Sequence, residues 1–311
     1  MKQTKFEQQK YNEMRRSLCI EFKYAKKPSI HKILTEAKGM MEGSDEIINA
    51  VLYKMQQETQ NGKINAKVVI NQNDILPFLK TQPFFENIAI TINYEQAPKM
   101  SADGQYTPMF NFLTSDKKMF NVNIECNFEG IYTEIQNEIE ATLEHELLHA
   151  YEDYQRLVKT GKDLGDASRK SGVKANYKAL SFAEESNNKI IRQLCLIYYY
   201  STSNEVKAYI AGFKRQIKYF KNTITNADEA MEIVKNTECY ESYVRVGEIL
   251  NDIIINLEGN REYIEKWYQL VYNKKLSAGK IMRRLRNLYN TSWYKIRKNI
   301  ASYIRYIYEQ Q

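Results

Sequence analysis

The sequence predicts an α+β chain in which a small, mostly antiparallel sheet precedes a large helical part. Within residues 64–128, apolar and polar side chains alternate with a period of two, which is typical of strands with one buried face. Beyond residue 130 the apolar spacing changes to three and four, which is typical of amphipathic helices. We therefore expect three parts, namely an N-terminal helical segment (1–63), a sheet-containing domain (64–222) and a C-terminal helical extension (223–311).

Composition excludes several classes of protein. The chain has 311 residues, of which 12 are Gly and 5 are Pro, so neither a fibrous nor a disordered chain is expected. The N-terminus is polar and no apolar run approaches membrane-spanning length, so we expect neither a secretory signal nor a membrane partner. The cysteines are scattered, which predicts free thiols in a reducing compartment, either a cytoplasm or a virion assembled in one. They are Cys19, Cys126, Cys195 and Cys239.

Each predicted element has its own pattern. Residues 30–59 carry apolar side chains at helical spacing and indicate two short helices that are broken near Gly43. Alternation over 88–94 and over 120–128 indicates two strands. Between them, the polar residues Thr114 to Lys118 indicate the turn of a hairpin.

Two of the three histidines lie together in the stretch "ATLEHELLHAYEDY". Apolar residues recur every four positions from 131 to about 158, so this stretch belongs to one long amphipathic helix. His145 and His149 are then one turn apart and project together, with Glu146 beside them. Two imidazoles at this spacing can bind one zinc ion, and the adjacent carboxylate can take a proton from a water molecule. The alternative is a pair of ordinary histidines at the surface or at the edge of the core.

The segment His145-Glu146-Leu147-Leu148-His149, followed by Asp153, resembles the active-site helix of the zincin metallopeptidases, and among these it is most similar to the thermolysin-like gluzincins. The resemblance covers roughly residues 64–215. It implies a zincin-like domain in which an antiparallel edge strand precedes the helix and pairs with the peptide substrate. The candidate for that strand is "MFNFL" at 109–113.

The resemblance also implies a glutamate from a later helix as the third zinc ligand, often within an Asn-Glu pair. Glu205, in "STSNEVKAYIAGF", fits this position, and Ala208 and Gly212 on the same helical face would allow close approach to the histidine helix. Glu184 and Glu185 are substitutes. A capping box of Thr202 and Glu205 is the metal-free alternative.

The implied activity is peptide hydrolysis with Zn²⁺ as cofactor and a protein or peptide as substrate. Glu146 would be the general base, and zinc would lower the pKa of the attacking water. Asp153 would either orient a ligand histidine or be solvated. Members of the family also tend to supply a histidine or tyrosine that steadies the oxyanion. No histidine follows His149, so Tyr209 is the candidate for that role.

A second class of function is indicated by residues 273–308, which contain ten Lys or Arg and no Asp or Glu. This segment contributes +10 to a net charge of +7, so the rest of the chain sums to −3. Basic helices with interleaved aromatic residues bind nucleic acid or dock on acidic proteins, whereas a solvated basic face over a packed core is the commonplace alternative. We expect a contact surface here, with protein docking slightly favoured.

The alternative function is a structural or assembly protein. Gly is scarce while Ile, Asn, Lys and Tyr are abundant, and this bias often accompanies an AT-rich genome such as that of some bacteriophages. In this alternative the chain is a component of a phage particle, its zincin-like domain serves packing rather than proteolysis, and the segment 273–308 is its docking or nucleic-acid-binding surface. An oligomer is compatible with either function.

Overall fold

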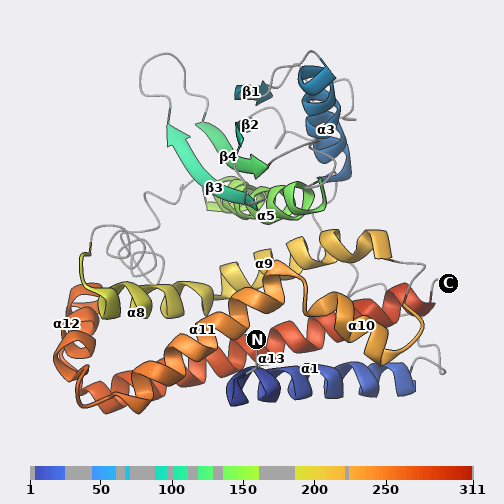
Figure 1. Cartoon of the computed structure of the whole chain (residues 1–311). Coiled ribbons are helices and arrows are strands. Elements are labelled where there is room, and N and C mark those ends of the chain that lie inside the picture. The colour runs from blue at the N-terminus through green and yellow to red at the C-terminus, as the bar shows by residue number, and fades with distance from the viewer. Residues whose placement is uncertain are drawn as a thin grey trace. The chain divides into compact units, whose positions relative to one another are not determined.

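The computed structural model describes residues 4–24, 44–60, 67–70, 88–96, 101–110, 118–128, 136–160, 186–220 and 224–309 (Figure 1). These residues form two compact units. The first unit contains α1 (Lys5–Tyr24), α8 (Lys189–Tyr200), the first half of α9 (Ser203–Ile217), α10 (Ala227–Val234), α11 (Glu238–Ile255), α12 (Arg261–Tyr272) and α13 (Ala278–Glu309). The second unit contains α3 (Ser44–Gln60), four strands, α5 (Gln136–Thr160) and the second half of α9. The division predicted along the sequence stays a prediction.

The sheet of the second unit consists of β1 (Lys67–Ile70), β2 (Ile88–Gln96), β3 (Ser101–Phe110) and β4 (Lys118–Phe128) in the order β1-β2-β4-β3. β1 pairs antiparallel with β2, β2 pairs parallel with β4, and β3 pairs antiparallel with β4. β3 is therefore an edge strand. Pro108 of β3 fits an edge position, because proline has no backbone N–H to donate and therefore occurs in sheets mainly on edge strands.

The predicted α+β class is wrong for the chain as a whole, because helices make up most of the described residues. The sheet is a minor part of a mostly helical protein, and it is mixed, since its central pair is parallel. Alternation along a strand indicates which face is buried, but it does not indicate which strand lies alongside. One side of β4 pairs with β3 in the antiparallel direction, and the other side pairs with β2 in the parallel direction.

The core of the second unit lies between the sheet and α5. Ile90 and Ile92 of β2 and Val122 and Ile124 of β4 are fully buried, as their alternation predicts. Helix α5 packs on β3 and β4 and presents an apolar stripe at helical spacing. The buried members of that stripe are Ile139, Leu143, Leu147 and Ala150. This packing fixes the rotation of α5 and hence the direction of its polar residues.

The first unit is built around α13, the long red helix of Figure 1. Its core contains Trp293 and Tyr289, both nearly fully buried. Helix α1 packs along α13, and the Trp293 indole Nε1 donates a hydrogen bond to Glu13 Oε2 at 2.6 Å. Three helices of this unit begin at residues whose side chains accept hydrogen bonds from the first-turn amides. These N-caps are Asn188 for α8, Asn226 for α10 and Thr237 for α11.

Several expectations lie outside the described residues. They are the helix before Gly43, most of the Thr114 to Lys118 turn, and residues 131–135 of the histidine helix. Cys19, Cys195 and Cys239 are free thiols, and burial raises the pKa of Cys195 to about 11. Among the described helices, none combines the length and apolar character that a membrane span requires.

Candidate metal centre

Helix α5 brings the two predicted histidines together. The spacing of four residues places His145 and His149 on one face, and their Nε2 atoms are 3.2 Å apart. Their ring centroids are 5.0 Å apart with the rings nearly perpendicular. Both side chains are half-buried, because they adjoin the apolar stripe that packs on the sheet. They are accessible enough to receive a ligand and enclosed enough to hold their orientation.

Helix α9 approaches α5 closely at a glycine. A Cβ atom on Gly212 would lie 2.9 Å from the carbonyl oxygen of Ala141 and 3.8 Å from Cβ of His145. The first distance is shorter than real Cβ contacts, so any larger residue would push the two helices apart. Gly212 therefore acts as the small residue that the sequence indicated, and it seats the second half of α9 beside the first histidine.

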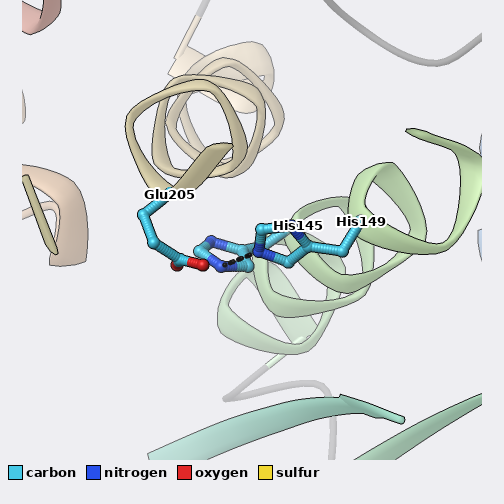
Figure 2. Close-up of side chains that lie close together, drawn as sticks. All are labelled: His145, His149 and Glu205. Atoms are coloured by element: carbon cyan, nitrogen blue, oxygen red, sulfur yellow. Dashed lines mark hydrogen bonds between the residues drawn. The ribbon is translucent and has the colours of Figure 1, made fainter. Parts of the chain in front are cut away.

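Glu205 lies two turns before Gly212 on the same continuous helix. Its carboxylate and the imidazole nitrogens of His145 and His149 contribute ligand atoms that all lie within 4.8 Å of one another. Figure 2 shows the three side chains converging from α5 and α9. Glu205 is buried, with 5% of its surface exposed. A buried carboxylate beside two imidazoles is an arrangement that could bind a metal ion.

The chemistry of this donor set suits a catalytic zinc site. Such sites use three protein ligands drawn from His and Asp or Glu and leave the fourth position open. Two ligand atoms that are each about 2.0–2.1 Å from a tetrahedral zinc ion lie roughly 3.3 Å from each other. The separation of the two Nε2 atoms, 3.2 Å, is close to that value. A hydrogen bond between a neutral N–H and the second imidazole has a similar length, so the distance suits both arrangements.

Glu146 lies at the same site and is buried against the edge strand. Its Oε1 is 4.0 Å from Nε2 of His145. β3 passes directly over it at Gly104, where an added Cβ would lie 2.7 Å from Cγ and 2.9 Å from Oε1 of Glu146. The same Cβ would lie 2.6 Å from Cγ2 of Thr142. Only glycine allows the strand to lie this close to the carboxylate.

An ion network with a buried centre joins α9 to α5 and α3. Arg215 Nε donates to Glu140 Oε2 at 2.9 Å, and both side chains are almost completely buried. The Arg215 guanidinium also binds Asp45, which accepts a second bond at 3.1 Å from Lys218 Nζ. Burial alone would lower the pKa of Arg215, but Asp45, Glu140 and Glu144 outweigh it and the net pKa is raised. The buried pair of Arg215 and Glu140 therefore holds α9 against α5, while Asp45, which also pairs with Lys218, compensates the guanidinium charge at the exposed edge of the network.

Asp153 and Tyr209, for which the sequence indicated supporting roles at the site, are both buried. Asp153 is buried rather than solvated, and its Oδ1 is 3.4 Å from Arg156 Nη1 one turn further along α5. Tyr209 is buried in the first unit, stacked on Tyr200 at 5.3 Å and perpendicular to Tyr243. Burial raises the pKa of Tyr209 well above its usual value, so its hydroxyl stays protonated at neutral pH. Its role in steadying an oxyanion stays a prediction.

The sequence left two alternatives to Glu205 as the third ligand, namely another glutamate or a metal-free capping box. Glu184 and Glu185 lie outside the described residues. Thr202, the other half of the proposed capping box, donates its hydroxyl to the carbonyl of Tyr199 at 2.9 Å in the preceding helix. The Glu205 carboxylate lies with the two histidines, which favours the role of metal ligand.

Sequence reasoning missed three features of this region. Gly104 is a glycine within a strand pattern, and this signal often marks a close approach of backbone and side chain. The predicted edge strand, 109–113, shares Met109 and Phe110 with the observed β3, whose start at Ser101 was not predicted, and residues 111–113 lie outside the described part of the chain. The pair of Glu140 and Arg215 carried no signal, since its partners are 75 residues apart and belong to separate helices.

No known protein family, curated protein or solved structure matches this chain.

Proposed function

We propose that this protein is a zinc-dependent metallopeptidase in which His145, His149 and Glu205 bind the metal and Glu146 is the general base. The observation that supports the proposal is the convergence of two imidazoles and one carboxylate within 4.8 Å, with a second carboxylate beside them on the same helix. A purely structural cluster would gain nothing from a fourth polar group that is buried against the edge strand.

The bound zinc ion would supply a Lewis acid that lowers the pKa of a water molecule to about 7. Glu146 then takes a proton as the water oxygen bonds to the peptide carbonyl carbon, and it delivers that proton to the amine nitrogen as the C–N bond breaks. β3 supports a peptide as substrate, because an edge strand can pair with an extended chain and Gly104 of this strand contacts Glu146.

The test separates metal binding from hydrolysis. Purified wild-type protein should contain one zinc ion per chain and cleave a general protein substrate such as casein. Replacing both His145 and His149 by Ala should abolish stoichiometric zinc, as measured by plasma mass spectrometry. Glu146→Gln should retain the zinc and lose hydrolysis, because an amide cannot accept the proton. Glu152→Gln, on the same helix, is the matched control and should behave as wild type.

Three outcomes contradict the proposal in different ways. Equal zinc content in the double histidine variant would exclude the metal site. Zinc in the wild type without hydrolysis of any substrate would favour the structural or assembly protein, with a zincin-like arrangement that serves packing alone. Wild-type hydrolysis by Glu146→Gln would exclude Glu146 as the base.

A further inference from the structure

The solvent-facing side of α13 carries an uninterrupted strip of basic and polar residues. We call this strip the basic face of α13, and it consists of Lys280, Arg283, Arg284, Arg286, Asn287, Asn290, Thr291, Tyr294, Lys295 and Lys298, all of which are exposed. Lys280 and Lys298 are 18 residues apart, so the strip is about 27 Å long at 1.5 Å per residue.

The charges of the basic face are not used within the fold. The two other basic residues of α13 have partners inside the fold. Arg297 donates to the carbonyl of Glu13 at 3.0 Å, and Arg305 forms ion pairs with Glu21 and Glu309. In the described part of the chain, no cation of the basic face forms an ion pair, and only Arg284 makes a hydrogen bond, to the hydroxyl of Tyr268. Six like charges along one helix repel one another, and a polyanion would relieve that repulsion.

The aromatic residues of this segment are occupied elsewhere, and this changes the expected partner. Tyr289, Trp293 and Tyr303 are buried in the core of their own unit. A stable protein interface has an apolar centre inside a polar rim, and Tyr294 is the single aromatic residue of the basic face. The expectation of protein docking is therefore weakened, because it depended on these aromatic residues being available to a partner.

We propose that the basic face of α13 binds the phosphate backbone of double-stranded DNA without regard to base sequence. A single exposed aromatic residue provides no series of stacking platforms, which single-stranded nucleic acids require. A helix about 10–12 Å in diameter enters the major groove of B-DNA, which is about 12 Å wide, but not the deep and narrow major groove of A-form RNA. Asn287 and Asn290 lie between the two groups of cations and supply further donors to phosphate and sugar oxygens.

The experiment measures the affinity of full-length protein for a 30-base-pair DNA duplex by fluorescence anisotropy at 50–300 mM salt. Six phosphate contacts predict a log-log slope of the association constant against salt of about −5. The variant Lys280→Glu, Arg283→Glu, Lys298→Glu should weaken binding by at least about 100-fold at 0.1 M salt and should reduce the magnitude of the slope by roughly 3. Two unrelated duplex sequences should bind equally.

A matched control separates the basic face from net charge. The variant Arg16→Glu, Lys189→Glu, Arg192→Glu reverses three exposed cations on α1 and α8, so both triple variants lower the net charge of +7 by 6, to +1. The control should bind DNA nearly as tightly as the wild type. The double histidine variant should also bind normally, because the basic face does not involve the metal ligands.

Four results would overturn the proposal. These are the absence of binding to the duplex at 50 mM salt, unchanged affinity in the α13 variant, an equal loss in both triple variants, and tighter binding to single-stranded DNA or to an acidic polypeptide such as polyglutamate. Circular dichroism of both triple variants verifies their fold, and their substituted residues are all exposed, so the helical signal should be that of the wild type.

Discussion

Helices α5 and α13 are both long and amphipathic, yet they place their charged residues in opposite surroundings. Helix α5 buries four carboxylates, namely Glu140, Glu144, Glu146 and Asp153. Helix α13 buries none of its charged side chains, and its only fully buried polar residue is Ser292, whose hydroxyl donates to the carbonyl of Ser201. One helix thus holds its charge inside the fold, while the other presents it to solvent.

The difference indicates which interactions each helix serves. A charge inside a protein costs several kcal/mol unless a partner compensates it, so the acids of α5 depend on neighbours such as Arg215. An exposed charge costs the fold almost nothing, and its partners can lie outside the molecule. Substitutions in the surroundings of α5 should therefore change stability and chemistry, whereas substitutions on the basic face should change association alone.

The largest effect on stability is expected from Arg215→Met. The substitution leaves Glu140 buried without its cation and should lower the free energy of unfolding by about 3–5 kcal/mol. Urea unfolding at neutral pH measures this loss. The matched control is Arg286→Met on the basic face, which should change stability by no more than about 0.5 kcal/mol.

A second variant keeps this result interpretable. Adding Glu140→Leu to Arg215→Met replaces the buried pair by apolar side chains and should recover much of the lost stability. Recovery identifies the uncompensated charge as the cause. Equal losses in Arg215→Met and Arg286→Met would show that the contrast between buried and exposed charge has no energetic consequence.

A smaller effect is expected where β3 crosses α5. Gly104→Ala places a Cβ within 2.9 Å of Glu146 Oε1, so the strand or the carboxylate must shift at a cost of about 1–3 kcal/mol. If Glu146 is the base, peptide hydrolysis should fall more than stability does, while zinc content stays unchanged. Gly279→Ala in the first turn of α13 is the control, because its added Cβ meets no atom within 4 Å. Unchanged hydrolysis in Gly104→Ala would mean that the close approach of β3 does not position Glu146.

The sequence predicted the local features of this site better than the long-range ones. Helical spacing brought His145 and His149 together, and the alternation over β2 and β4 identified their buried faces, because both are properties of a single element. The predominance of helix and the parallel central pair of the sheet were missed. The contact of Gly104 with Glu146 was missed as well. The pairing of strands and the contacts between elements depend on segments that are distant in the sequence and meet only in the folded chain. Glu205, whose carboxylate lies near the two histidines, was suggested by the family resemblance and not by helical spacing, and its role as a metal ligand stays a prediction.

The ion network and the basic face should also differ in their response to acid. Burial alone would raise the pKa of Asp45, but its bonds to Arg215 and Lys218 outweigh burial and the net pKa is lowered. A carboxyl whose pKa is lower in the folded state stabilises the fold above its unfolded-state pKa of about 3.9, and that stabilisation is lost as pH falls through the folded-state value. The basic face contains no Asp or Glu, so no carboxyl group within it contributes such a dependence.

Asp45→Asn is the variant that exposes this difference. It should be less stable than wild type at pH 5–7, by less than about 1 kcal/mol because Asp45 is largely solvent-screened, and the gap should close as the pH falls below about 4. For Lys280→Met on the basic face, the difference from wild type should stay constant from pH 3 to 7. Urea titrations at several pH values measure both differences. If the Asp45→Asn gap were constant with pH, the carboxylate would not be stabilised by its two cations, and α9 would be held to α5 by the pair of Glu140 and Arg215 without help from α3.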